Sequence, residues 1–306
     1  MKSSPKMKHL RTFDLIESVM RAGSIRKASE DMNLTASALN RRINGFEEEF
    51  GGPIFERLPR GMRLNPAGEL LMQHIRAQRT DLQRVQSQVA DLSGVRRGHV
   101  SIACSQALLP YFLPEQIARY RAEHPGVTFS INIRDRAQAE QDLASVSSDL
   151  ALVFEPIHLV DFEVLFALPQ NVQAVFRDDS PLATKQNLRL RDCVRQKLVL
   201  PSRVYGVRHL LEMGAKRKGF TLDADIETES FELIRHYVTH ENALGFQIPI
   251  GLDPGRQSGI TYRQVSEQDV SPGQLLLGQM KGRVLPIASA RFANQLMTAL
   301  AARASG

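Results

Sequence analysis

Residues 24–50 read SIRKASEDMNLTASALNRRINGFEEEF and predict two helices in succession. Ser24 is a candidate N-cap for a short helix over 25–32, and Thr35 is the candidate for a longer helix over 36–50. Apolar residues recur at helical spacing along the longer helix: Leu39, Ile43, Phe46 and Phe50. The stretch therefore predicts a helix-turn-helix whose second helix packs one face on a core.

The opposite face of the longer helix is polar, and its first half has no carboxylate. Four side chains project there: Ser37, Asn40, Arg41 and Asn44. In helices that enter the major groove of DNA, the N-terminal half supplies base contacts, with Asn suited to adenine and Arg to guanine. Taken alone, this pattern is more typical of an ordinary solvated helix face.

The flanking segments support the DNA-binding interpretation. A helix over 10–22 precedes the pair, and residues 51–64 read as two short extended runs around a turn at 59–61. A basic hairpin beside such a helix is typical of a wing that contacts phosphate. We therefore predict a winged helix-turn-helix over 1–64. Its candidate DNA-binding residues are Ser24, Thr35, Ala36, Ser37, Asn40, Arg41, Asn44, Arg57, Arg60 and Arg63.

The positive charge of the chain is concentrated in its first third. Residues 1–97 hold 17 Lys and Arg against 11 Asp and Glu, whereas residues 98–306 hold 22 of each. The net charge of +6 therefore belongs to the first segment alone. A basic module joined to a neutral one is what nucleic-acid binding by one domain produces, although a solvated surface can also be basic by chance.

A long linker helix is predicted over 65–93. Asn65 is a candidate N-cap, and Pro66 stands at the first helical position. Apolar residues then follow coiled-coil spacing, with Gln78 in one of the positions: Leu71, Ile75, Leu82, Val85, Val89 and Leu92. We interpret this seam as a dimer interface, which would place two recognition helices about one DNA turn, ~34 Å, or a multiple of it apart. The alternative is packing on the helix's own chain.

Residues 94–306 predict an α/β domain with two lobes. Strand and helix patterns alternate from 100 to 154 and again from 172 to 247, which favours parallel sheets. The extended runs at 260–265 and 274–280 and a helix over 286–302 are expected to return to the first unit. We place lobe I at about 98–166 and 267–306 and lobe II at about 167–266, with a cleft between them.

Ligands of open α/β sheets bind outside the carboxyl ends of the strands. That rule nominates the following effector-binding residues: Cys104, Ser105, Gln106, Arg134, Phe154, Glu155, Ser202, Arg203, Thr228, Phe246 and Gln247. Arg203 could hold a carboxylate, with Ser105 and Ser202 donating hydrogen bonds to it. For each residue, the alternative to effector binding is a role as a helix cap or a packing residue.

Metal, disulfide and membrane sites are not indicated. Cys104 and Cys193 are the only cysteines, far apart and without metal-ligand spacing. His236 and His240 stand four residues apart, but they lack a third ligand and are better explained as a surface pair. No run of ~18 apolar residues exists to span a bilayer. We expect a cytoplasmic protein that needs no cofactor and has no membrane partner.

The first 70 residues resemble the LysR-type transcriptional regulator family. The pattern is carried by Phe13, Gly23, Ser24, Ala28, Ala38 to Ile43, Glu47, Gly51, Ile54 to Arg57, and Pro66 to Gly68. Ala36, Asn40 and Asn65 depart from the residues usual at these positions in the family, which are Gln, Ser and Thr.

The resemblance implies a regulator that binds a promoter inverted repeat in double-stranded DNA as a homodimer or homotetramer. It implies an effector domain similar to periplasmic binding proteins, a small-molecule effector with carboxylates among the candidates, and RNA polymerase as a candidate partner. Two rivals stay open: an enzyme or solute-binding protein with an extra N-terminal module, and a DNA-binding protein whose cleft takes no ligand.

Overall fold

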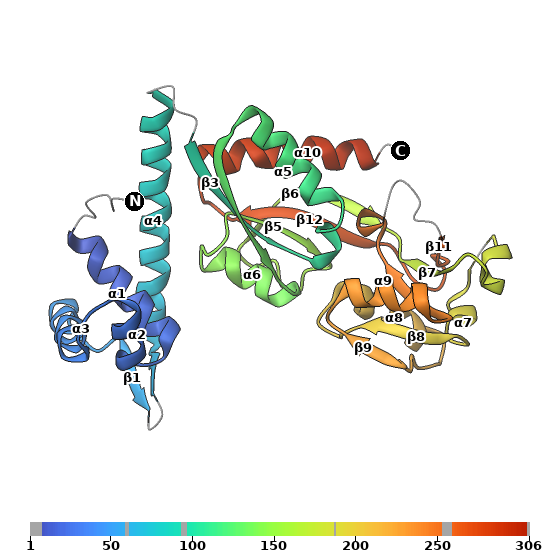
Figure 1. The fold of residues 1–306 in the computed structure, drawn as a ribbon, viewed down its shortest axis with the longest axis horizontal. Coiled ribbons are helices and arrows are strands. Elements are labelled where there is room, and N and C mark those ends of the chain that lie inside the picture. The colour runs from blue at the N-terminus through green and yellow to red at the C-terminus, as the bar shows by residue number, and fades with distance from the viewer. Residues whose placement is uncertain (1–7, 59–60, 93–96, 187, 253–258, 305–306) are drawn as a thin grey trace. The chain divides into compact units, whose positions relative to one another are not determined.

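The structure is a computed structural model that describes residues 8–58, 61–92, 97–186, 188–252 and 259–304. The chain forms two compact units, Met1–Leu82 and Gln83–Gly306, and the boundary between them falls within one long helix. Figure 1 shows the elements of each unit.

The first unit is a winged helix-turn-helix. It contains α1 (Lys8–Ala22), α2 (Ile25–Asp31), α3 (Ala36–Phe50), the antiparallel strands β1 (Phe55–Leu58) and β2 (Gly61–Leu64), and the first part of α4 (Pro66–Leu92). Leu39 and Ile43 of α3 are fully buried in the core of this unit, as the apolar stripe predicts. Phe50 departs from that prediction, because 45% of its surface is exposed at the C-terminal end of α3.

The hairpin is attached to the end of α1. The backbone N–H of Met62 donates to the carbonyl oxygen of Gly23 over 2.8 Å. Gly61 has φ of 137°, and a Cβ at this position would lie 2.5 Å from the same carbonyl oxygen. Glycine is therefore required where the second strand of the wing passes the α1–α2 turn.

The apolar seam of α4 has two different environments. Leu71 and Ile75 are buried in the core of their own unit, so this part of the seam packs on its own chain rather than on a partner. Val85 and Val89, further along the helix, are 47% and 56% exposed. The dimer interpretation therefore applies to the second half of the seam only. Arg79, between the halves, pairs with Asp14 and Glu17 of α1.

The second unit contains two five-stranded sheets. The first has the order β4-β3-β5-β12-β6 and is formed by β3 (Arg97–Cys104), β4 (Gly126–Ile133), β5 (Leu150–Phe154), β6 (Phe162–Gln170) and β12 (Gly273–Met280). Helices α5 (Phe112–Glu123) and α10 (Ile287–Ala304) lie on one face, and α6 (Arg136–Ala144) covers the other (Figure 1).

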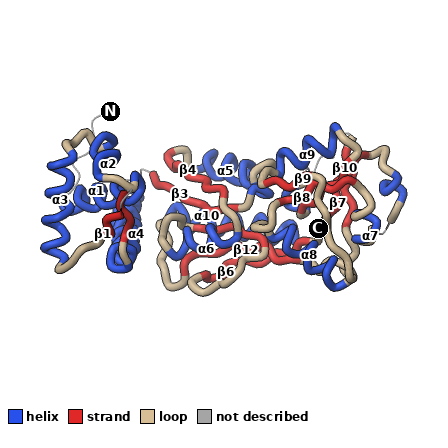
Figure 2. Tube along the Cα trace, turned by 90° about the horizontal axis from the view of Figure 1, so that it is seen from below, coloured by secondary structure: helices blue, strands red, loops and turns tan. Residues whose placement is uncertain are grey.

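The second sheet has the order β11-β7-β10-β8-β9. Its strands are β7 (Gln173–Arg177), β8 (Lys197–Pro201), β9 (Ile226–Thr228), β10 (Ala243–Gln247) and β11 (Ile260–Gln264), and its helices are α7 (Leu190–Cys193), α8 (Gly206–Arg217) and α9 (Phe231–His240). Short turns of 3-10 helix are η1 (Gln106–Leu108), η2 (Pro181–Thr184) and η3 (Pro249–Gly251). Figure 2 colours the strands of this unit red and its helices blue.

Both sheets are mixed, which corrects the expectation of parallel sheets. β12 runs antiparallel to β5 and β6, and β7 runs antiparallel to β10 and β11. These strands follow the passages of the chain between the two sheets, where no crossover helix restores the strand direction. β11 pairs with β7, so the run at 260–265 belongs to the second sheet rather than returning to the first. Strand β6 was not expected as an element.

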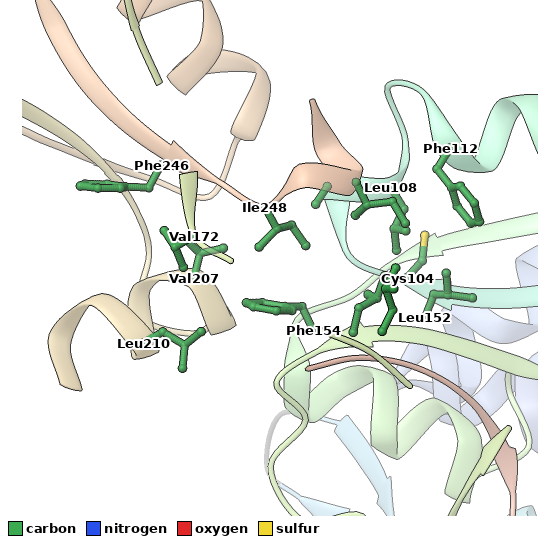
Figure 3. Packing of buried hydrophobic residues seen from close by; sticks show 14 of the residues in the cluster. Cys104, Leu108, Phe112, Leu152, Phe154, Val172, Val207, Leu210, Phe246 and Ile248 are labelled. Atoms are coloured by element: carbon green, nitrogen blue, oxygen red, sulfur yellow. The ribbon is translucent and has the colours of Figure 1, made fainter. Parts of the chain in front are cut away.

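The two sheets meet through buried apolar side chains. Figure 3 shows Phe154, from the end of β5, pointing toward Val207 and Leu210 of α8 and toward Val172. A Cβ added at Gly206, the first residue of α8, would lie 2.6 Å from the carbonyl oxygen of Phe154. The glycine therefore allows the start of α8 to lie directly against the end of a strand of the other sheet.

Candidate nucleic-acid interface and ligand cleft

The exposed face of α3 carries most of the predicted base-reading residues. Ala36, Ser37 and Arg41 are exposed, and Asn40 and Asn44 are half-buried. Thr35 has extended backbone angles and caps the helix, because its hydroxyl oxygen accepts from the N–H of Ala38 over 3.2 Å. The cap leaves the first turn of α3 at the surface, so its polar side chains can reach a duplex.

The wing is connected to this helix. Arg57 of β1 donates from Nη2 to Asn40 Oδ1 over 3.3 Å. This contact uses an oxygen that Asn40 would need to pair with adenine. Arg63 of β2 instead donates to Glu56 over 2.6 Å, so its charge is partly neutralised within the hairpin. Arg60 lies outside the described residues.

Ser24 occupies the N-cap position of α2, but its side chain makes no capping hydrogen bond. Its hydroxyl can therefore contact a phosphate without loss of a cap. Sequence reasoning passed over three exposed basic residues of the helix-turn-helix: Arg26 and Lys27 of α2 and Arg42 of α3. Their charge was the available signal, and only the fold shows that they are exposed on these helices.

In the second unit, the ends of β3, β4 and β5 meet the start of α8. Ser105, Arg134 and Phe154 from the predicted set line a small cavity there. Arg136 and Tyr205, which sequence reasoning missed, line it as well. We call this cavity the strand-end cleft. Its volume is about 10 Å³, which is about the space of one water molecule, so the two lobes are closed on each other here.

Gln106 forms a bridge between the lobes. It lies in η1, directly after β3, and its Nε2 donates to the carbonyl oxygen of Glu229 over 2.7 Å and to the Tyr205 hydroxyl over 3.3 Å. Its Oε1 accepts from the N–H of Phe231 over 3.2 Å. All three partners belong to the second lobe. Gln106, Phe246 and Gln247 line a separate, larger cavity of about 260 Å³.

Five of the predicted effector-binding residues line neither cavity. Cys104 is fully buried in the core beside Leu108 and Leu152, as Figure 3 shows, and burial raises the pKa of its thiol to about 12. Its role is packing, and an inert thiol follows. Arg203 is 74% exposed, pairs with Glu212 over 3.2 Å and is absent from the lining of both cavities.

Two of the other three residues, Glu155 and Thr228, have structural roles. Glu155 has φ of 54° and accepts from the N–H of Gln274 over 2.6 Å, which joins the end of β5 to β12. Thr228 accepts from the N–H of Ser230 over 3.1 Å, just before α9. The Ser202 hydroxyl is buried and has no hydrogen-bond partner among the described residues. None of them reaches the strand-end cleft.

Two protein-family models match the chain. The bacterial regulatory helix-turn-helix protein model of the lysR family matches residues 7–69, and the LysR substrate binding domain matches residues 93–301, more than half of the chain. The chain belongs to the LysR family. It is a LysR-type transcriptional regulator with a helix-turn-helix and an effector-binding domain.

Individual relatives agree with this assignment. The chain is 24% identical to the HTH-type transcriptional activator CmpR of Synechocystis sp., over 75% of each chain. A full-length OxyR variant from Pseudomonas aeruginosa has a TM-score of 0.68 and 16% identity, covering 97% of this chain and 95% of its own. The effector binding domain of QuiR in complex with shikimate has a TM-score of 0.58 and 16% identity, covering 67% of this chain and 98% of its own.

The described residues contain no group of three or more His, Cys, Asp or Glu placed to hold a metal ion. The Nε2 atom of His236 instead lies 2.9 Å from Oε1 of Glu232, on the surface of α9. Within the same residues, no helix is long and apolar enough to cross a membrane.

Proposed function

We propose that this LysR-family chain reads a promoter inverted repeat through α3 and the wing, as a homodimer or a pair of dimers. The observation that supports this most directly is the first half of α3, which is capped by Thr35, carries the exposed Ser37 and Arg41 and contains no carboxylate. The exposed Val85 and Val89 of α4 are the surface proposed to form the dimer. RNA polymerase is the proposed partner in transcription, and no chemical step is required.

We further propose that the effector is a small anion bound in the strand-end cleft. Arg134 and Arg136 both line this cleft, together with the Asp135 carboxylate, and Arg134 also pairs with Asp142 over 2.8 Å. The Asp135 carboxylate is engaged in capping α6, where it accepts from the N–H of Gln138 over 2.8 Å. Two arginines and Ser105 in one lining suit a carboxylate, and the QuiR domain bound to shikimate supports the same class.

The closed cleft implies how an effector would act. A volume of about 10 Å³ excludes a metabolite, so the effector binds only when the lobes move apart. A ligand that binds only the open arrangement shifts the population toward it, and the shift changes how the dimer holds its half-sites. The closed arrangement is then the effector-free state of the regulator.

The first experiment is selection of bound duplexes from a random library by the full-length protein at ~150 mM salt, where non-specific binding is weak. Enrichment of an inverted repeat with half-sites about one turn apart, ~34 Å, supports the dimeric regulator. If neither the protein alone nor the protein with a metabolite extract enriches a motif, the proposal loses its basis. Turnover by the second unit would then revive the enzyme interpretation.

The anion assignment is tested by thermal unfolding of the full-length protein with a panel of carboxylates that includes shikimate. A ligand at 100 times its dissociation constant should add ~2.7 kcal/mol to the free energy of unfolding. The gain should disappear in Arg134→Gln and Arg136→Gln and persist in Arg119→Gln, which removes an exposed guanidinium on α5. Equal gains in all variants would place the carboxylate elsewhere.

A further inference from the structure

The larger of the two cavities beside Gln106 has the size and the wall of a ligand site, and it is distinct from the strand-end cleft. Its volume of about 260 Å³ is close to the lower end of the range for small-molecule sites, about 300–1,000 Å³. The wall is formed by residues around η1 on one side and by β7, α9, β10 and β11 on the other. Its apolar members include Leu109, Val175, Phe231, Ile234, Phe246 and Leu252.

Gln106 and Phe231 separate the two cavities. Phe231 is the one residue that both linings share. Gln106 lines the larger cavity and is hydrogen-bonded to Tyr205, which lines the strand-end cleft. Gln106 and Phe231 would therefore separate a molecule in the larger cavity from the arginines that line the strand-end cleft.

The charged side chains in the wall of the larger cavity neutralise each other. Glu232 and Arg235 stand three residues apart on α9, and Arg235 Nε donates to Glu232 Oε2 over 3.1 Å. This hydrogen bond lowers the pKa of the Glu232 carboxyl and raises that of the Arg235 guanidinium, so both stay charged and paired. A charged ligand would be buried in an apolar wall without a counter-charge, which is costly.

The wall of the larger cavity leaves few hydrogen-bonding groups for a ligand to satisfy. Gln106 already uses both ends of its amide in the bridge. Gln247 uses Oε1 to accept from the N–H of Ile248 over 2.9 Å, and no acceptor for its Nε2 is found among the described residues. A ligand with one hydrogen-bond acceptor could satisfy this donor. Aromatic rings from Tyr111, Phe231, Phe246 and Tyr262 complete the wall and favour a planar partner.

We propose that the larger cavity is a second ligand site, for an uncharged aromatic molecule with one hydrogen-bond acceptor. The site differs from the proposed effector site in both position and charge. Occupancy of one does not require occupancy of the other.

The test uses the full-length protein and two matched probes, 4-fluorobenzamide and 4-fluorobenzoate, followed by fluorine NMR. The probes have the same shape, but only the benzoate is charged. We expect 4-fluorobenzamide to bind with a dissociation constant below about 1 mM. Val175→Phe, which fills the cavity from β7, should weaken this binding at least tenfold. Leu252→Phe fills it from the partly exposed side and should have the same effect if Val175→Phe does not fold.

The control is Ile117→Phe, which adds the same kind of ring in a separate groove along α5. This variant should bind 4-fluorobenzamide as the unmodified chain does. The proposal is overturned if neither probe binds at 1 mM and above. It is also overturned if the cavity-filling variants retain their melting temperature and still bind 4-fluorobenzamide as the unmodified chain does. A third contrary result is 4-fluorobenzoate binding that is as strong as that of the amide and that Val175→Phe weakens equally. Benzoate binding that depends on Arg134 instead would report on the strand-end cleft.

Discussion

The side-chain amide of Gln106 donates a hydrogen bond to the backbone carbonyl of Glu229 across the boundary between the two lobes, over 2.7 Å. The same amide accepts from the N–H of Phe231, so a single side chain of the first lobe holds the start of α9 in the second. The bridge stands between the strand-end cleft and the larger cavity. Any opening of the lobes at this point must break it.

Gln106→Ala should therefore loosen the closed arrangement. Each lost hydrogen bond is worth about 0.5–1.5 kcal/mol, and about 1 kcal/mol lowers the melting temperature of a domain of this size by about 2–4 °C. Hydrogen exchange of the Phe231 amide should accelerate as well, since its acceptor is removed. Gln138→Ala, at an exposed position on α6, is the control and should change neither quantity. Unchanged exchange at Phe231 in Gln106→Ala would show that the bridge does not hold the lobes.

The two candidate caps of the helix-turn-helix should respond differently to loss of their hydroxyl groups. Thr35→Ala removes the cap of α3 and should lower the free energy of unfolding of the first unit by about 1 kcal/mol. Ser24→Ala should leave stability nearly unchanged, because the Ser24 side chain makes no capping bond. Its effect, if Ser24 contacts a phosphate, is weaker binding to all duplexes. Chemical denaturation of both variants distinguishes the two roles, and an equal loss of stability would contradict the assignment.

Local signals in the sequence predicted the first unit well, because the residues at the ends of its helices cap the nearby backbone or adopt a backbone conformation that ends a helix. Thr35 caps α3 at the predicted residue, and Gly51, with φ of 91°, closes it in the left-handed conformation. Asn65 accepts from the N–H of Gly68 over 2.8 Å at the start of α4, as expected of a cap. The hydrogen bond between Arg57 and Asn40 could not be predicted, because it joins residues that only the fold brings together.

The ligand cleft was less predictable, because strand ends identify positions but not the direction of side chains. Ser105 and Arg134 do line the strand-end cleft, whereas Arg203 turns toward Glu212. Arg136 was missed because it stands two residues past Arg134, the residue nominated at this strand end, in the first turn of α6. The division of the nominated residues between two cavities follows from the Gln106 bridge, a contact across more than a hundred residues of sequence.

Arg41 is the side chain on α3 expected to contribute most to sequence discrimination. Arg41→Ala should cost about 1–3 kcal/mol for the best motif and much less for random duplex, so the ratio of the two affinities falls. Arg119→Ala removes the same charge from an exposed site in the second unit and should leave this ratio unchanged. Affinity measurements on both duplexes at the same salt concentration provide the comparison. An equal loss on both duplexes would move Arg41 from the base-reading group to the phosphate-binding group.

Asp269 should make the second unit sensitive to acid. Its buried carboxylate accepts from Arg189 Nε and Nη2 over 2.8 and 2.7 Å and from the N–H of Leu190 over 3.0 Å, and these contacts hold its pKa well below the usual value. Because the folded pKa is lowered, the stabilisation is fully present above the unfolded value of about 3.9 and is lost as the pH falls toward the folded pKa.

Asp269→Asn should accordingly lower the free energy of unfolding near neutral pH by on the order of 2 kcal/mol, since it removes charged hydrogen bonds from a buried position. The difference from the unmodified chain should shrink as the pH is lowered from about 5 toward 3, because the carboxylate of the unfolded chain takes up a proton in this range while that of the folded chain stays charged. Asp179→Asn is the matched control, because its partner Arg177 lies with it at the surface, where solvent screens the pair. Urea denaturation across this pH range measures both variants. A constant difference for Asp269→Asn at every pH would show that the residue stabilises the lobe through packing rather than through its charge.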